Sequence, residues 1–243
     1  MANFEESNTR NYFSNTTRTS PMLISTRIDS SSLLDQSVDI ESLLFDPYPV
    51  DRVSKGKVTV EKGFCSLYQY ENQSNPGRIL LYAYRRFCGF EIYRKGESKD
   101  FFIGSLKSNL IGTEYVLRTK DGNILSIKYH TAWFKRRKPR TFTVLFYKNV
   151  DKVDISKYPI VMRNKEPFHN SESNSYSLNF NGRVTTPSVK NFQLVHPLDP
   201  TYITLTFGKI SPTTYIMDHT YPLSAFLGFS VALGALDKKL FCD

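Results

Sequence analysis

Five basic residues fall within six positions near the middle of the chain, and their combined charge suits the binding of anions. They are Lys135, Arg136, Arg137, Lys138 and Arg140. A run of this kind between strands is typical of a solvated loop, but it also fits an anionic membrane, nuclear import or nucleic acid. Near a membrane, each basic side chain would contribute about 1 kcal/mol. The cluster is therefore a candidate secondary basic patch whose partner stays open.

Residues that usually perform catalysis or hold metals do not come together in the sequence. The four histidines (His130, His169, His196 and His219) are scattered, without an HExxH pair or Cys/His ligand spacing. Neither a Walker loop nor GxGxxG occurs. The nearest approach to a nucleophile elbow, at 228–232, lacks the second glycine and falls in an apolar segment that substrate could not reach. We expect no enzyme activity, metal or cofactor.

Positive charge is concentrated after the first 50 residues. The chain carries a net charge of +9, yet residues 1–50 hold three basic and seven acidic residues, so the remainder carries +13. Such an excess attracts anionic lipid headgroups or nucleic acid. The three cysteines have no CxxC spacing, which fits free thiols in a reducing compartment, and no secretory signal pattern opens the chain. These features predict a cytoplasmic protein.

The segment 221–243 predicts the element around which the fold is built. No charged residue occurs from Leu223 to Leu236, and Pro222 suits the first turn of a helix. A helix at 224–236 would be apolar on every face, so protein must surround it. Its apolar part of about 14 residues is shorter than the ~20 that cross a bilayer. A buried helix is therefore favoured over a membrane span.

Short segments that alternate, or are rich in β-branched and aromatic residues, fill the chain before this helix. They predict strands at 58–60, 66–70, 79–84, 90–93, 101–106, 114–118, 124–129, 142–147, 160–162, 175–180, 191–195, 202–207 and 215–217. A closed antiparallel barrel has no free edges and can hold one apolar helix in its lumen. We therefore predict a mainly β fold, a closed antiparallel barrel of about twelve strands that encloses a central C-terminal helix.

The first 50 residues are predicted to form a tail before a barrel domain at 51–243. Residues 1–30 are rich in Asn, Ser and Thr, which predicts disorder. Residues 31–45 place apolar side chains along one side of a short acidic helix that Ser31 or Ser32 could cap. This segment would pack on the barrel or fluctuate, or it would dock a cargo or trafficking protein.

Three separated blocks resemble the tubby C-terminal domain family. They are residues 102–115 (FIGSLKSNLIGTEY), 179–196 (NFNGRVTTPSVKNFQLVH) and 206–243, and 135–145 is a looser match to the family's Pro-Arg strand. The resemblance covers about 57–243. It implies a twelve-stranded barrel around a central helix, in a cytoplasmic module that binds phosphoinositides, typically phosphatidylinositol 4,5-bisphosphate.

The same resemblance implies a headgroup site. In the family, basic side chains on the strand with a Leu-Leu run, and the basic residue of the Ile-Gly block, hold the phosphates. The matching positions here are Arg85 and Arg86, and Lys107. Charge-assisted contacts from Arg and Lys suit phosphate oxygens. Residues 87–89 cut the family's longer basic run to two, and lysine replaces its arginine at 107, so weaker affinity or a different phosphate pattern is expected.

Three functions stay open. The favoured one is a monomeric phosphoinositide-binding adaptor in trafficking or signalling, peripheral at the plasma membrane, with a ciliary role and a nuclear pool left open. The alternatives are a nuclear DNA-binding or transcription-regulating protein, with nucleic acid the less favoured partner, and a scramblase-like lipid protein, since phospholipid scramblases resemble the same barrel. The chain opens Met-Ala and ends Cys242-Asp243, without myristoylation or CaaX patterns, so reversible peripheral attachment is expected.

Overall fold

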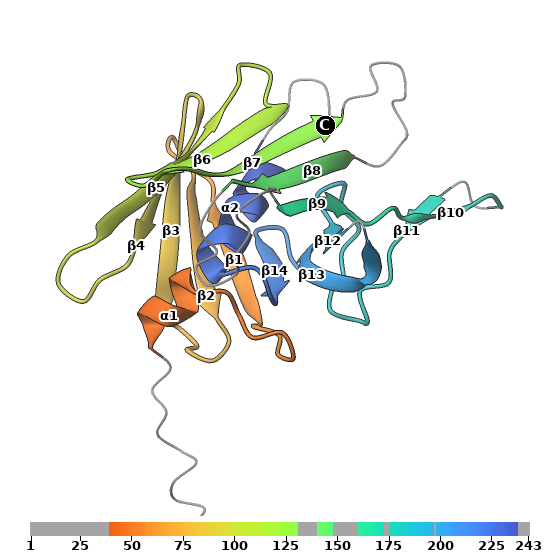
Figure 1. The fold of residues 1–243 in the computed structure, drawn as a ribbon, viewed down its shortest axis with the longest axis horizontal. Coiled ribbons are helices and arrows are strands. Elements are labelled where there is room, and N and C mark those ends of the chain that lie inside the picture. The colour runs from red at the N-terminus through yellow and green to blue at the C-terminus, as the bar shows by residue number, and fades with distance from the viewer. Residues whose placement is uncertain (1–38, 131–139, 148–159, 173–174, 197, 238–243) are drawn as a thin grey trace, which may run out of the picture. The chain divides into compact units, whose positions relative to one another are not determined.

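The computed structural model describes residues 39–130, 140–147, 160–172, 175–196 and 198–237. Within them, twelve antiparallel strands close into a barrel that surrounds a C-terminal helix (Figure 1). Closure is made by β1, which pairs with β2 on one side and with β14 on the other. The predicted barrel with an enclosed helix is confirmed.

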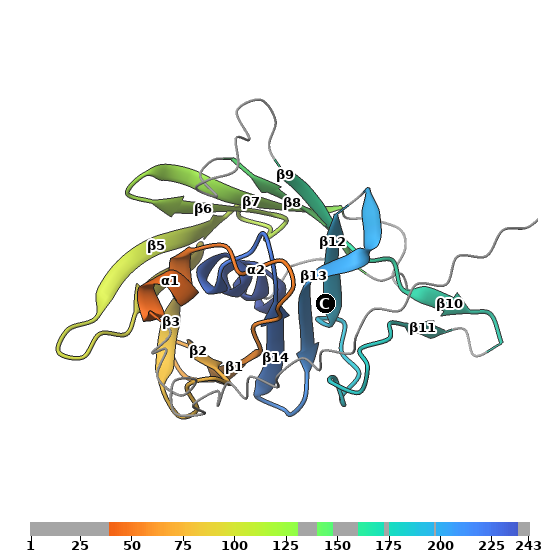
Figure 2. The same cartoon turned by 60° about the horizontal axis from the view of Figure 1, so that its bottom comes forward.

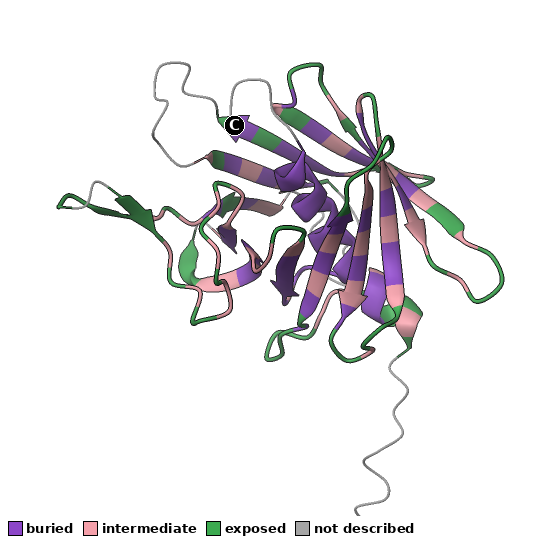
Figure 3. Ribbon diagram, turned by 180° about the vertical axis from the view of Figure 1, so that it is seen from behind, coloured by how far each residue is buried: buried purple, intermediate pink, exposed green. Residues whose placement is uncertain are grey.

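Around the barrel the strands follow the order β1-β14-β13-β12-β9-β8-β7-β6-β5-β4-β3-β2. Their bounds are β1 Gly56–Glu61, β2 Leu67–Asn72, β3 Ile79–Arg86, β4 Gly89–Arg94, β5 Phe101–Ser108, β6 Glu114–Thr119, β7 Gly122–His130, β8 Thr141–Phe146, β9 Ile160–Asn164, β12 Phe192–His196, β13 Asp199–Lys209 and β14 Thr214–His219. Buried and less buried residues alternate along most of these strands (Figure 3), because successive side chains point to opposite faces of a sheet.

One predicted strand lies outside the barrel. Of residues 175–180, only β11 (Ser175–Ser177) is a strand, and it pairs with β10 (Phe168–Asn170) in a separate two-stranded sheet. The chain then turns at Asn181 and Gly182, both with positive φ, which ends the extended stretch. All three residues of β10 are exposed, so this strand has no buried face. The sequence therefore lacks the alternation of apolar and polar residues that would have predicted a strand there.

The central helix α2 (Ala225–Leu236) is buried at all twelve positions, as its apolar sequence requires. Ser224 is its N-cap, since the side-chain oxygen accepts a hydrogen bond from the Leu227 amide at 3.3 Å. Pro222 therefore precedes the cap and does not form the first helical turn, which corrects the sequence prediction. Within the described residues, no helix combines the length and apolar character needed to cross a membrane.

The short helix α1 (Ile40–Phe45) packs against the same core. Asp39 caps it by accepting a hydrogen bond from the Glu41 amide at 3.1 Å. Helix α1 lies beside α2 (Figure 2). Leu43 and Leu44 are buried, and the Phe45 ring meets the Phe226 ring of α2 edge to face, with 5.7 Å between the ring centroids. Residues 31–38, with the predicted caps Ser31 and Ser32, lie outside the described residues. Where the acidic segment is described, its apolar side is occupied by the barrel core.

The turns between strands divide between two ends of the barrel, because neighbouring strands run in opposite directions. The hairpin end carries the turns 62–66, 87–88 and 109–113. The α1 end carries α1 and the turns 73–78, 95–100 and 120–121. Helix α2 starts at the α1 end, where the Tyr48 amide donates to the Leu223 carbonyl at 3.0 Å.

Candidate functional site

Arg86 and Lys107 share the outer face of the barrel at its hairpin end. In the register of β3, β4 and β5, Arg86 is opposite Gly89, and Gly89 is opposite Lys107. Directly paired residues point to the same face, so the two basic side chains flank β4. Gly89 has φ +112°, and a Cβ there would meet the Leu106 carbonyl oxygen at 1.9 Å. Only glycine fits between the two cations.

Glu91 forms an ion pair with one member of this pair, Arg86. Arg86 donates to Glu91 Oε2 through Nε at 2.8 Å and Nη2 at 2.7 Å, and the Tyr93 hydroxyl also donates to Oε2 at 3.3 Å. The Arg86 hydrogen bond lowers the pKa of Glu91, and the charge of Lys107 acts in the same direction. Lys107 is exposed, and among the described residues it forms no ion pair within 4.0 Å. Arg86 is thus paired with Glu91, whereas Lys107 faces solvent.

Arg85 points to the opposite side of the sheet, into the mouth of the barrel. Its Nε donates to Asp237 Oδ1 at 2.8 Å, and the Tyr115 hydroxyl donates to Oδ2 of the same carboxylate at 2.9 Å. Asp237, the C-cap of α2, is only 3% exposed. Burial, and then the negative charge of Asp237, raise the pKa of Tyr115, and the same two causes raise the pKa of Tyr68 to about 12. Arg85 therefore neutralises a buried carboxylate.

A second cation supports this end of α2. Lys190 Nζ donates to the Leu236 carbonyl at 2.8 Å. The C-terminus of a helix carries unpaired carbonyls and partial negative charge, so Arg85 and Lys190 both complement it. Of the three residues implied by the family resemblance, the structure brings Arg86 and Lys107 onto one face and directs Arg85 to this helix end.

Only one residue of the secondary basic patch lies in the described part of the chain. Arg140 precedes β8, and its carbonyl accepts a hydrogen bond from Asn164 Nδ2 at 3.0 Å, while Asn164 Oδ1 accepts from the Phe142 amide at 2.7 Å. Lys135, Arg136, Arg137 and Lys138 lie outside the described residues. The flanking residues His130 and Thr141 are paired at the hairpin end.

The sequence prediction missed Glu91 and Asp237 as partners of the two arginines. Glu91 lies five residues after Arg86, and the tight turn at 87–88 brings the two side by side, so the short spacing was a usable signal. Asp237 is 152 residues from Arg85 and no local pattern connects them. Ser230, at the centre of the elbow-like segment, is fully buried and donates to the Phe226 carbonyl at 2.8 Å.

This chain is similar to known proteins, both through a family model and through individual relatives. The model of the Tub family matches residues 146–238. Human tubby-related protein 3 is 28% identical over 268 residues, covering 88% of this chain and 60% of the relative. Protein king tubby 2 of Aedes aegypti is 36% identical over 179 residues, 59% of this chain and 42% of the relative. Protein king tubby of Drosophila pseudoobscura pseudoobscura is 35% identical over 256 residues, 84% of this chain and 55% of the relative.

These names specify no enzymatic activity, and the chain spans between 42% and 60% of the relatives' own length. Sequence identity is modest throughout, while the barrel closed around α2 agrees with the resemblance drawn from the three sequence blocks. Together, the family match over 146–238, the curated relatives and the barrel fold confirm the resemblance of this chain to the tubby family, at modest sequence identity.

Proposed function

We propose that the chain binds a phosphoinositide headgroup at the hairpin end and acts as a peripheral adaptor on the cytoplasmic face of a membrane. The observation that carries the proposal is the placement of Arg86 and Lys107 on one exposed face, either side of a glycine. Two cations fixed by three hydrogen-bonded strands suit a ligand with two phosphates, because charge-assisted bonds to phosphate are strong and Arg can hold two oxygens. Phosphatidylinositol 4,5-bisphosphate is the favoured ligand.

In this proposal a phosphate competes with Glu91 for the guanidinium of Arg86. The guanidinium carbon also lies 5.7 Å from the centre of the Tyr84 ring, a contact that keeps the side chain near the surface of β3 when Glu91 is displaced. Lys107 needs no such exchange. We therefore expect the headgroup to bind first through Lys107 and to gain affinity as Arg86 changes partner.

The proposal is tested by flotation of the full chain with phosphatidylcholine vesicles, with and without phosphatidylinositol 4,5-bisphosphate. Arg86→Ala combined with Lys107→Ala should weaken binding to the phosphoinositide vesicles by on the order of tenfold or more for each residue. The matched control is Arg78→Ala with Lys120→Ala, which removes two exposed cations from the α1 end. An equal loss of vesicle binding in both double variants would mean that only net charge matters. Unchanged binding of the Arg86→Ala, Lys107→Ala variant would mean that the site lies elsewhere.

A substitution of Glu91 tests the competition directly. Glu91→Gln keeps the size of the side chain but removes the charge that holds Arg86, so binding to phosphoinositide vesicles should become tighter. The gain should vanish in an Arg86→Ala background, because Glu91 would then have no arginine to release. Weaker binding by the Glu91→Gln protein would show that the carboxylate supports the site and does not compete for it.

Cellular attachment follows from the same chemistry. Contacts to headgroups and surface charge are reversible, and salt screens them. Activation of a phospholipase C should therefore release a fluorescent fusion of the full chain from the plasma membrane. A fusion that stays in place after the lipid is consumed would favour a protein anchor over this mechanism.

A further inference from the structure

Three large apolar side chains protrude from successive turns at the hairpin end. The exposed fractions are 108% for Phe64, 92% for Phe87 and 84% for Leu110. Single exposed apolar residues are ordinary on protein surfaces. Phe64 and Phe87 have almost no contact with the rest of the protein and lie close to the basic face. Their exposure on successive turns indicates a contact with something outside the barrel.

Backbone hydrogen bonds fix the three turns next to one another. The Arg85 amide donates to the Ser66 carbonyl at 3.1 Å, which links the first turn to the end of β3. The Ser108 amide donates to the Cys88 carbonyl at 3.3 Å, which links the second turn to the third. Because Arg86 pairs with Gly89, the second turn contains only Phe87 and Cys88, too few residues to fold back over the barrel.

Basic residues lie directly beside these apolar tips. Lys62 is exposed two positions before Phe64, and Arg86 immediately precedes Phe87. Lys107 lies opposite Gly89, at the base of the same turn. Apolar groups beside cations match the boundary of an anionic bilayer, where headgroup phosphates lie just outside the hydrocarbon. A protein partner would be matched by a continuous apolar patch, whereas these side chains stand on separate turns.

We propose that Phe64, Phe87 and Leu110 insert into an anionic bilayer while Arg86 and Lys107 hold the headgroup. The inference rests on the proposed headgroup site and adds a second, apolar contribution to binding. The hairpin end then points into the membrane, and affinity for a bilayer exceeds affinity for the soluble headgroup. Salt weakens only the charged contribution, because apolar insertion carries no charge.

The test compares two ligands with one pair of substitutions. Phe64→Ser with Phe87→Ser in the full chain is titrated with soluble inositol 1,4,5-trisphosphate and with phosphatidylcholine vesicles that carry phosphatidylinositol 4,5-bisphosphate. We expect affinity for the soluble headgroup within twofold of wild type and affinity for vesicles about tenfold weaker for each phenylalanine. Phe64→Leu with Phe87→Leu should restore most of the vesicle affinity. Leu198→Ser is the matched control, because Leu198 is 89% exposed in a turn at the α1 end.

The outcomes separate this inference from the proposed function. Unchanged vesicle affinity of the serine variant, with headgroup binding intact, overturns insertion and assigns the phenylalanines to a protein contact. Equal weakening by Leu198→Ser overturns it as well, since the effect would not belong to the hairpin end. Wild-type protein that binds vesicles but not the soluble headgroup counts against the headgroup site, and the serine variant still reports on insertion.

Discussion

The two ends of the barrel are completed in different ways. At the α1 end the chain covers its own core, since Leu43 and Leu44 of α1 are buried against it. At the hairpin end Phe64 and Phe87 remain exposed beside basic residues. The apolar side chains of α1 are packed within the chain, whereas Phe64 and Phe87 on the hairpin turns are not. The difference is consistent with the proposed membrane contact at the hairpin end.

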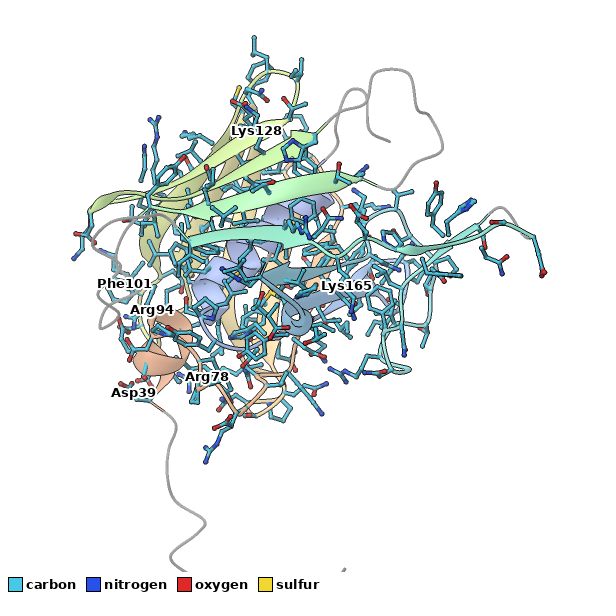
Figure 4. The ribbon with its side chains drawn as sticks, turned by 45° about the vertical axis from the view of Figure 1, so that its right-hand side comes forward. Asp39, Arg78, Arg94, Phe101, Lys128 and Lys165 are labelled. Carbon is cyan, nitrogen blue, oxygen red and sulfur yellow. The ribbon has the colours of Figure 1, made fainter. Side chains whose placement is uncertain are left out.

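Charge also distinguishes the segment that covers the α1 end from the face of the hairpin end that carries Arg86 and Lys107. Residues 39–51 contain four acidic residues and no basic one. Of these, Glu41 forms an ion pair with Arg94, whose guanidinium carbon lies 4.7 Å from the centre of the Phe101 ring. Figure 4 labels Arg94, Phe101 and Asp39 at this end of the barrel. The acidic segment 39–51 itself disfavours an anionic membrane, whereas the pair Arg86 and Lys107 at the other end favours one.

The largest expected effect is a difference in stability between two variants, each with one apolar residue replaced, one at each end of the barrel. Leu44→Asp places a carboxylate in the core and should destabilise the protein by at least about 4 kcal/mol, or prevent folding. Phe87→Asp places the same group in solvent and should change stability by no more than about 0.5 kcal/mol. Urea unfolding of both variants measures the difference. Comparable losses would mean that the hairpin end is as tightly packed as the α1 end.

A smaller effect concerns pH at the α1 end. His219 is 1% exposed, neither ring nitrogen has a hydrogen-bond partner among the described residues, and its ring lies 5.6 Å from that of Tyr48. Burial lowers the pKa of His219 from 6.5 to about 4. The unfolded chain therefore binds this proton first, so stability falls as pH decreases from 6.5 towards 4, by about 3 kcal/mol in all.

His219→Phe should remove that part of the pH dependence. The measurement is the free energy of unfolding of both proteins at pH 7 and pH 4.5, compared as slopes so that any packing cost of the larger ring cancels. Identical slopes would show that His219 is paired or hydrated in solution.

The next difference is expected between Arg85 and Arg86, whose replacement by alanine should affect the free energy of unfolding to different extents. Arg85→Ala leaves the buried Asp237 with less compensation and should cost roughly 1–3 kcal/mol, discounted because Arg85 itself is 39% exposed. Arg86→Ala should leave the free energy of unfolding almost unchanged, because its pair with Glu91 lies at the surface. Adding Asp237→Asn to Arg85→Ala should recover part of the loss in a double-mutant cycle. Equal costs for the two arginines would contradict their opposite orientations.

Much of the fold could be predicted from sequence because its strongest constraint is local. The uncharged run of α2 requires enclosure, and period-two alternation marks strands that face the core on one side. The sheet of β10 and β11 lacks a buried face, so no such signal predicted β10 or separated β11 from the barrel.

The site was less predictable, for reasons visible in single residues. Alternation alone could have placed Arg85 and Arg86 on opposite faces, but the family resemblance grouped them. The buried partner of Arg85 comes from the far end of the chain and required the fold. Phe87 interrupts the family's basic run in the sequence, yet in the structure it forms the tip of the turn beside Arg86.

The most direct test of the account is which end of the barrel meets the membrane. An environment-sensitive fluorophore is placed on Cys65, which is exposed in the first turn of the hairpin end, with Cys88→Ser and Cys242→Ser removing the other thiols. The matched label uses Leu198→Cys at the α1 end, with all three native cysteines replaced by serine. On phosphatidylinositol 4,5-bisphosphate vesicles that contain nitroxide lipids, we predict quenching at position 65 and none at position 198. Equal quenching at both positions, or quenching at 198 alone, would contradict it.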